Sequence, residues 1–421
     1  MIMKPISILL SFVYTPLILS YLGDSKYGIW AIILNIISWI NYFDIGIGNG
    51  LRNKLTEAIS LNNFRAAKRY VSTAYAGTLA ISVAFGILIN ILWNTLHLSS
   101  FFNLELQDEN VDFIIFLSVF FVCLNFVLSL SKTSAYAIQQ PAVISVAEVI
   151  CQVVQIAVIY LIAMKTKGRL LNVALIYGII ILLSSLLVFL VISRKREYLR
   201  PDIRLISKDS FKPLFVLGSG FFVLQICSLI LNTTDNLLIS NLYGSEEVTP
   251  YSLVYNTFYI LVQIHAIIIM PLWSAYTEAY VKKDIIWIRN TIKKINIITL
   301  VFSIAAVAGI FIFEPFAIIW LRKDYQYEKL LIIIVAIYMI AQMFANNYSS
   351  FLCGVGHIGA SVAIASLGAI INIPLSVILS KICGLRLSGV ILGSLIVMLI
   401  NVIVLPIVSK HWIDKMKRGE T

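Results

Sequence analysis

The chain has 421 residues, of which 60% are apolar and 13% charged, and its mean hydropathy is +0.92. Soluble proteins carry about 25% charged residues, so this composition excludes both a water-soluble enzyme and a disordered chain. It indicates an all-α integral membrane protein, because a spanning helix needs about 20 apolar residues and the short connections leave no room for a soluble catalytic domain.

Nearly charge-free stretches predict about twelve membrane-spanning helices. These helices lie at residues 3–22, 29–50, 70–96, 111–131, 142–164, 170–192, 213–242, 250–276, 295–320, 330–352, 361–380 and 387–409. Residues 330–380 contain no Asp, Glu, Lys or Arg, and the glycine-rich run 354–359 is their only turn signal. The N-terminal apolar stretch is longer than the core of a cleavable signal, so it predicts the first span.

The distribution of positive charge predicts the orientation of these spans. Of 32 Lys and Arg residues, 23 lie at the termini or in loops after even-numbered spans, and 9 lie in the other loops. Both termini are then cytoplasmic, and no Lys or Arg lies deep in a predicted span. This asymmetry accounts for the net charge of +11. The basic loop 194–212 suits anionic lipid, whereas no groove-reading motif predicts a nucleic-acid partner.

An internal repeat appears at a constant offset of 221 residues, without a gap. Thr56-Glu57-Ala58 matches Thr277-Glu278-Ala279. Other pairs at this offset are Gly23 and Gly244, Asn35 and Asn256, Asn125 and Asn346, Ser129 and Ser350, and Ser145 and Ser366. An even number of spans per half predicts two pseudo-symmetric six-helix bundles, at residues 1–200 and 201–421, with a cavity between them.

Ionisable side chains inside the bilayer are costly, so they are the first candidates for function. The repeat offset places Asp44 and His265 at equivalent positions of spans two and eight. A carboxylate and an imidazole on one cavity could hold or relay a proton. Alternatively, Ser, Thr, Asn or Tyr side chains satisfy each group inside its own bundle.

Three further candidates lie at cytoplasmic ends of spans. Arg52 follows the run 46–50, in which three glycines let a helix bend or let another backbone come close. Its planar guanidinium suits a diphosphate, and the alternative is an anchor at the membrane surface at the end of span two. Glu57 and Glu278 occupy equivalent positions, where they would form either a cytoplasmic gate contact between the halves or ion pairs with nearby Lys and Arg.

Two polar groups lie within spans five and seven. Glu148, Gln152 and Gln155 recur at i, i+4 and i+7, which places them on one helix face. A polar stripe in lipid must face protein or water, so we expect it to line the cavity. Asp235 belongs to the polar run 232–236 near the outer end of span seven, which is either a cavity wall or an interfacial end.

No motif predicts catalysis, a metal site or a cofactor. The five cysteines are far apart without a C-x-x-C pair, which is typical of apolar packing. The chain lacks an H-E-x-x-H motif and a Walker lysine, so transport would run downhill or on an ion gradient. The many aromatic residues, Tyr251, Tyr255 and Tyr259 among them, would pack the core and membrane interfaces or stack on sugar rings.

Three blocks of sequence are distinctive. They are PLILSYLGDSKYGIW at residues 16–30, FDIGIGNGLRNK at 43–54, and LYGSEEV at 242–248, which continues to Tyr251-Ser252. The chain resembles bacterial O-antigen flippases (Wzx-type) of the multidrug/oligosaccharidyl-lipid/polysaccharide (MOP) exporter superfamily. The resemblance implies a MATE-like fold, and it places Asp44 and Arg52 at charged motif positions near the cavity.

The resemblance also implies a function. Such proteins move undecaprenyl-diphosphate-linked repeat units from the cytoplasmic to the periplasmic leaflet of the bacterial inner membrane, by alternating access coupled to an ion gradient. Polysaccharide polymerase and chain-length machinery would be the protein partners. A drug antiporter of the same fold would favour an acidic, aromatic pocket. A membrane polymerase or glycosyltransferase would need a long hydrophilic outer loop, whereas the longest here, about 97–110, has no Lys or Arg.

Overall fold

A computed structural model of the chain describes residues 3–41, 46–95, 108–194, 196–244, 247–321 and 327–418. Within these ranges the protein is helical and has no strand. Ten described helices are long and apolar enough to cross a membrane, and α1 (Met3–Asn41) adds two helical arms that meet at Gly23. The expected all-α membrane fold of about twelve helices is confirmed.

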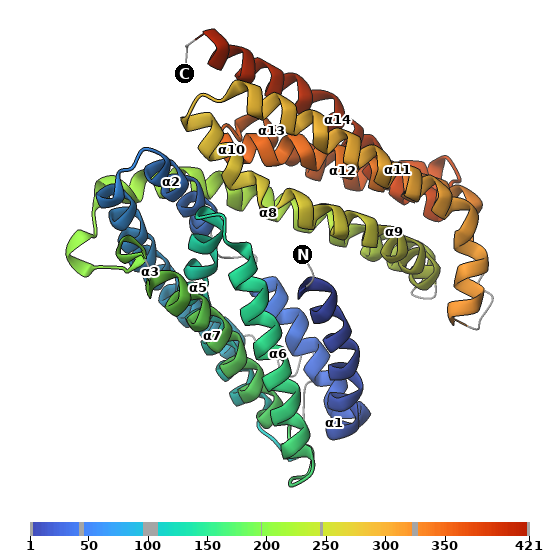
Figure 1. The fold of residues 1–421 in the computed structure, drawn as a ribbon. Helices are drawn as coiled ribbons and strands as arrows, with labels where there is room; N and C mark the ends of the chain where they lie inside the picture. Colours follow the sequence, from blue (N-terminus) through green and yellow to red (C-terminus); the bar gives the residue numbers. More distant parts are fainter. Residues whose placement is uncertain are drawn as a thin grey trace. The chain divides into compact units, whose positions relative to one another are not determined.

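The chain forms two compact units, Met1–Phe222 and Val223–Thr421, whose helices are labelled in Figure 1. The first contains α1, α2 (Ile47–Ser60), α3 (Phe64–Thr95), α5 (Val111–Ala137), α6 (Pro141–Ala163), α7 (Leu170–Arg194) and the start of α8 (Lys208–Tyr243). The second contains the end of α8, α9 (Val248–Ile269), α10 (Leu272–Val281), α11 (Ile285–Leu321), α12 (Lys329–Val355), α13 (Gly359–Val377) and α14 (Arg386–Arg418). The boundary lies inside α8, whereas the sequence places its division before this helix.

The second span of each unit is broken near its end, which the hydropathy pattern does not predict. The sequence predicts single helices at 29–50 and 250–276, but α2 begins separately at Ile47 and α10 at Leu272. Gly46 is left-handed (φ 67°), and Pro271 directly precedes α10. A left-handed residue cannot continue an α-helix, and proline lacks the N–H that a helix interior uses. Neither break can be predicted from apolar composition alone.

The repeat keeps its offset of 221 residues at the turn that follows each break. Asn62 and Lys283 are both left-handed, with φ angles of 56° and 57°. The residue after each of them, Asn63 or Asp284, caps the next helix, because its side-chain oxygen accepts from a backbone N–H three residues later at 3.0 Å. The two halves therefore share this turn in sequence register and in geometry.

The offset falls to 217 residues at the ends of α5 and α12. There the left-handed residues that end the helices are Gln139 and Gly356. In both units the next backbone N–H returns to the carbonyl five residues earlier, at 2.8 Å and 3.1 Å. At these helix ends the offset therefore differs by four residues from the gap-free alignment predicted from the sequence.

An acidic residue before α5 binds the start of α7, and one before α12 binds the start of α14. Glu109 accepts from the first two N–H groups of α7 at 2.8 Å and 2.9 Å and from Lys26 Nζ at 2.9 Å. Burial raises the pKa of Glu109, but these hydrogen bonds and the Lys26 charge outweigh it, so the pKa lies below its ordinary value. Glu328 accepts likewise from the backbone and hydroxyl of Ser388 in α14.

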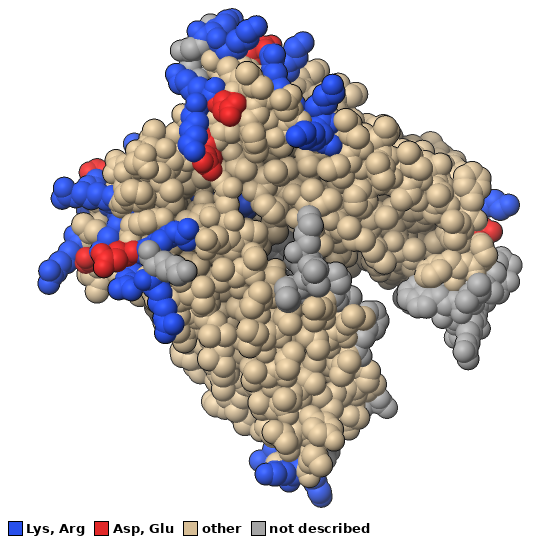
Figure 2. Space-filling model, viewed as in Figure 1, with Lys and Arg blue, Asp and Glu red and all other residues tan. Residues whose placement is uncertain are grey.

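Each unit has its own apolar core and leaves apolar side chains exposed along its helices. Trp30 and Val173 are buried in the first unit, and Val254 and Val335 in the second. Phe311 remains 79% exposed on α11. Figure 2 shows Lys and Arg gathered at helix ends, with long uncharged surfaces between them. This distribution suits helices surrounded by lipid.

Small residues let α2 lie directly against α8 in the first unit. A Cβ added at Gly46 would collide with the backbone of Gly218, and one at Gly50 would lie 2.6 Å from the carbonyl oxygen of Leu214. The glycine run therefore permits close backbone approach, as its composition indicates.

We expect Gly50→Ala to destabilise the protein by about 1–3 kcal/mol, because backbone atoms cannot move aside as a flexible side chain can. Thermal unfolding of the detergent-purified protein measures this effect. Gly359→Ala is the matched control, since a Cβ there meets nothing within 4 Å. Equal melting temperatures for the two variants would contradict the close packing of α2 on α8.

Candidate functional site

A polar pocket of about 250 Å³ lies inside the first unit, among α1, α5, α6 and α7. The stripe predicted from the sequence, Glu148, Gln152 and Gln155, contributes three of its lining residues. Lys132 on α5 and Ser184 on α7 line it as well. The stripe therefore faces a protein pocket, as a polar helix face in lipid must.

Lys132 provides the positive charge of this pocket. Its Nζ lies 3.0 Å from Oε1 of Glu148, and both side chains keep partial access to solvent. The sequence places Lys132 in the loop after span four, but α5 continues to Ala137 and carries this lysine on its inner side. Sequence analysis missed this lysine, because a hydropathy pattern ends a span wherever the first charge appears.

The amides of the stripe are held by α1. Ser7 Oγ donates to Gln152 Oε1 at 2.7 Å, and Gln155 Nε2 donates to the Tyr14 hydroxyl at 2.8 Å. The Ser184 hydroxyl is buried and has no hydrogen-bond partner among the described residues. The pocket thus combines an ion pair, amides and a hydroxyl, which can hydrogen-bond a polyhydroxyl or phosphorylated ligand.

Asp235 lies in a second buried polar cluster, within the second unit. It is 4% exposed, and Oδ2 accepts from the Tyr251 hydroxyl at 2.8 Å. Ser394 Oγ lies 3.2 Å from both carboxylate oxygens and itself accepts from Asn372 Nδ2 at 2.8 Å. No described ion pair involves Asp235, so a proton or a small cation would have to neutralise it.

A stack of tyrosines lies beside this carboxyl. Tyr251 and Tyr255 stack with centroids 6.0 Å apart, and Tyr255 and Tyr259 follow at 5.8 Å. Tyr338 of α12 packs against Tyr255 at 6.3 Å. The spacing i, i+4, i+8 could have indicated the stack from the sequence, but Tyr338 and Ser394 are brought in only by tertiary packing.

One ring nitrogen of His265 is hydrogen-bonded within its own bundle. It is fully buried, and Nε2 lies 2.9 Å from Thr299 Oγ1. Thr299 donates its hydroxyl proton to the carbonyl of Ile295 and accepts from Asn347 Nδ2, so an Nε2–H of His265 would donate to the Thr299 oxygen. Its Nδ1 is buried without a partner among the described residues. Its predicted counterpart, Asp44, lies outside the described residues.

The remaining sequence-derived candidates lie on α2 and α10. Arg52 is 4% exposed, with its guanidinium 4.9 Å from the centre of the Tyr136 ring. Glu57 pairs with Lys54 at 2.8 Å, and Glu278 pairs with Lys282. Both glutamates thus form local ion pairs, while their role as a gate stays a prediction.

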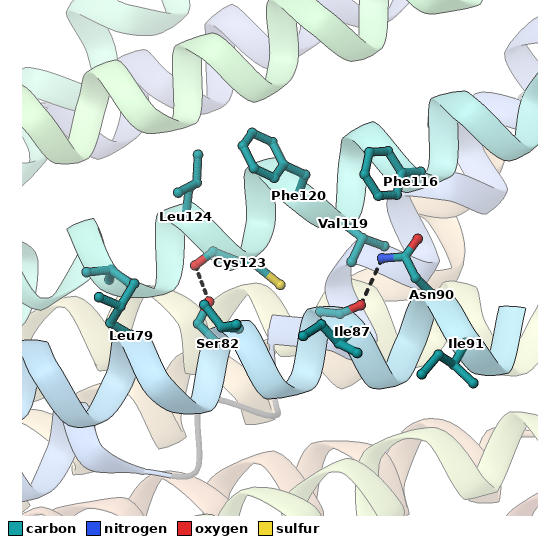
Figure 3. Close-up of a pocket in the computed structure, with 13 residues that line it drawn as sticks. Leu79, Ser82, Ile87, Asn90, Ile91, Phe116, Val119, Phe120, Cys123 and Leu124 are labelled. Atoms are coloured by element: carbon teal, nitrogen blue, oxygen red, sulfur yellow. Dashed lines mark hydrogen bonds between the residues drawn. The ribbon is translucent and has the colours of Figure 1, made fainter.

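An apolar groove of about 400 Å³ lies between α3 and α5 of the first unit. Figure 3 shows Leu79, Ile87 and Phe120 among its lining residues. Its polar groups are already used, since Ser82 donates to the Cys123 carbonyl at 2.5 Å and Asn90 donates to a carbonyl in its own helix at 2.8 Å. This groove offers contact to an apolar chain and nothing to a charged group.

The described residues contain no cluster of three or more His, Cys, Asp or Glu side chains that could hold a metal ion. Four cysteines are buried or half-buried and Cys383 is exposed, and all five are free thiols.

Comparisons with known proteins place these features in a family. A family model described as polysaccharide biosynthesis protein matches residues 1–277, and one described as MatE matches residues 221–378. A putative O-antigen export protein of Yersinia pseudotuberculosis is 23% identical over 83% of this chain and 80% of its own length. A putative O-antigen transporter of Salmonella typhimurium is 23% identical over 90% of this chain and 87% of its own length.

Solved structures with the same fold include MATE proteins. A MATE protein in the bent conformation superposes with a TM-score of 0.80 at 14% identity, covering 98% of this chain and 94% of that one. An outward-facing multidrug resistance MATE transporter of the MOP superfamily has a TM-score of 0.78 at 16% identity, with 99% and 95% covered. At these identities the likeness establishes the fold alone.

Proposed function

The chain belongs to the polysaccharide biosynthesis protein family, and within it we propose that this transporter is a flippase for lipid-linked oligosaccharides. Its cargo would be undecaprenyl-diphosphate-linked O-antigen or polysaccharide repeat units, moved from the cytoplasmic to the periplasmic leaflet. The names of its relatives describe transport and export of O-antigen, which supports this cargo and argues against an enzyme.

The observation that carries the proposal is the polar pocket of the first unit. An apolar bundle has no structural need for a solvent-accessible ion pair beside amides and an unpartnered hydroxyl. Lys132 would bind a diphosphate oxygen, while Gln152 and Ser184 would hydrogen-bond sugar hydroxyls. Alternating access would then carry this polar head across the membrane while the isoprenoid tail stays in lipid.

Reconstitution tests this function directly. The purified protein in liposomes should move a fluorescent undecaprenyl-diphosphate oligosaccharide between leaflets, measured by its protection from a membrane-impermeant quencher. Liposomes without protein provide the baseline. Movement at the baseline rate, with and without an ion gradient, would contradict the proposal.

A drug antiporter is the second candidate, and one observation favours it. The buried Asp235 beside Tyr251 and Tyr255 forms the acidic, aromatic environment that such antiporters favour. Efflux of a cationic dye from the same liposomes, without lipid movement, would support this alternative. For the flippase, the same Asp235 would be the residue that couples transport to a proton or sodium gradient.

The protein would lie in the bacterial inner membrane with both termini in the cytoplasm, where it would hand its product to the polymerase and chain-length machinery. We expect alkaline phosphatase fused after residue 421 to be inactive and a cytoplasmic reporter at the same point to be active. The reason is the excess of Lys and Arg on that side. Phosphatase activity in the periplasm would reverse the orientation.

Arg52 provides a further test. We expect Arg52→Lys to be partly defective in transport. Lysine keeps the positive charge, but it lacks the planar guanidinium that suits a diphosphate. Arg52→Ala should be about tenfold slower, which corresponds to about 1.4 kcal/mol. Surface polysaccharide in a flippase-deficient bacterium, divided by the amount of protein in the membrane, measures the effect. If Arg52→Ala protein fails to accumulate, the contact with Tyr136 is structural.

Glu57 and Glu278 as gate residues, and Asp44 with His265 as a proton pair, remain proposals. The same complementation assay applies to each of them.

A further inference from the structure

A second groove, larger than the polar pocket, lies among α11, α12 and α14 of the second unit. Its volume is about 860 Å³. Arg289, Lys293 and Lys410 line one end of it, and Ile297, Leu300 and Phe344 line the rest. None of these residues belongs to the polar pocket or to the Asp235 cluster, so the groove is independent of the proposed transport site.

Helical spacing separates the charged and apolar parts of the groove. Lys293, Ile297 and Leu300 recur at i, i+4 and i+7, so α11 presents a cation followed by two apolar side chains on one face. α14 contributes Lys410, about two turns before its C-terminal end at Arg418, and Pro406 lies one turn earlier. The charged end is the one that the positive-inside rule places at the cytoplasmic surface.

The charged end has a surplus of positive charge. Arg289 is paired with Asp414 at 3.1 Å. Lys293 and Lys410 have no carboxylate within 4 Å among the described residues and are exposed. Three cations with one carboxylate leave an excess of two positive charges, which attracts an anion at the membrane surface.

The wall of the groove also offers an unused hydrogen-bonding group. Ser409 is 1% exposed and lines the groove, and its hydroxyl has no partner in the described part of the chain. Beside it, Asn296 donates to the Tyr348 hydroxyl at 2.8 Å. A buried hydroxyl without a partner is costly, and a ligand oxygen at this wall would relieve that cost.

We propose that this groove binds an anionic phospholipid of the cytoplasmic leaflet. The phosphate would lie at Lys293 and Lys410, and one acyl chain would follow Ile297, Leu300 and Phe344. The combination favours such a lipid. A zwitterionic lipid has no net charge for the surplus cations to attract, and a free anion gains nothing from the apolar wall. The groove of Figure 3 has the apolar wall without the cations, so it does not select a head group.

Native mass spectrometry of the full-length protein tests this site, with phosphatidylglycerol and phosphatidylcholine as probes. Each lysine near an anionic surface contributes about 1 kcal/mol, or about fivefold in affinity. Lys293→Gln and Lys410→Gln should each weaken phosphatidylglycerol binding about fivefold, and the double variant by more than tenfold. Phosphatidylcholine binding should not change. The double arginine variant should retain the preference, because it keeps both charges.

Matched controls give the experiment its specificity. Lys165→Gln with Lys167→Gln removes the same charge from the turn before α7 and should leave the selective site intact. Unchanged lipid selectivity in the Lys293/Lys410 variant, or an equal loss in the control, would overturn the proposal. Displacement of phosphatidylglycerol by millimolar inorganic phosphate would also overturn it, since the site would then bind a free anion. Thermal unfolding of each variant excludes misfolding as the cause of any loss.

Discussion

Asp235→Asn is expected to remove the stimulation of transport by an ion gradient while leaving the fold intact. The carboxyl is 4% exposed and its described partners, Tyr251 and Ser394, are neutral. A buried carboxylate without a cation is strongly disfavoured, so in the proposed coupling this group would be neutralised by taking up a proton or a metal cation. Asparagine has nearly the same shape and can do neither.

Liposomes with an imposed pH gradient or sodium gradient measure this effect. The native protein should move its cargo faster with one of the two gradients, and the asparagine variant should move it at the rate seen without a gradient. Its melting temperature should be equal or higher, because a neutral amide is easier to bury than a carboxylate. The stimulation of transport by the gradient should be intermediate in Tyr251→Phe, since this change removes one hydrogen bond to the carboxyl of Asp235.

Asp112→Asn serves as the control for this experiment. Asp112 is an exposed carboxyl in the first turn of α5, where it accepts from Trp93 Nε1 at 2.9 Å. Its loss should leave the gradient response unchanged. Full stimulation in the Asp235 variant would remove this residue from ion coupling.

Lys132→Met is expected to reduce transport at least tenfold at normal protein levels. A charge-assisted hydrogen bond contributes about 1.5–3 kcal/mol, and about 1.4 kcal/mol corresponds to a factor of ten. Methionine keeps most of the length of the side chain but cannot bind a diphosphate. Lys132→Arg should retain most activity, and the exposed Lys165→Met should retain all of it. Complementation of a flippase-deficient bacterium provides the measurement.

A charge exchange separates binding from structure. Lys132→Glu combined with Glu148→Lys rebuilds the ion pair with its direction reversed. If the pair only holds α5 to α6, this double variant should recover activity that each single variant loses. If Lys132 binds the diphosphate from its own position, the double variant should stay inactive. Recovery to the native level would therefore refute the binding role.

Much of the fold is predictable from the sequence, because spanning helices in lipid must satisfy their own backbone and be apolar outside. The approximate number of spans follows from apolar composition, and the turn near Gly356 follows from the glycine-rich run 354–359. The breaks at Gly46 and Pro271 do not, since hydropathy averages over a window and is blind to a single backbone angle. The repeat is recognisable in the sequence at the turn after α2. The four-residue change in offset at the ends of α5 and α12 is not recognisable, because apolar helices can be aligned in several registers.

For the site, the sequence by itself identified the polar face of Glu148, Gln152 and Gln155, because helical periodicity places residues on a face without further information. Only the tertiary structure decided what that face meets. Lys132 joins it from another helix, and Ser394 reaches Asp235 from 159 positions away. Periodicity describes positions within one helix. The burial of the Asp235 carboxyl and the ion pair of Lys132 depend instead on which helices pack together.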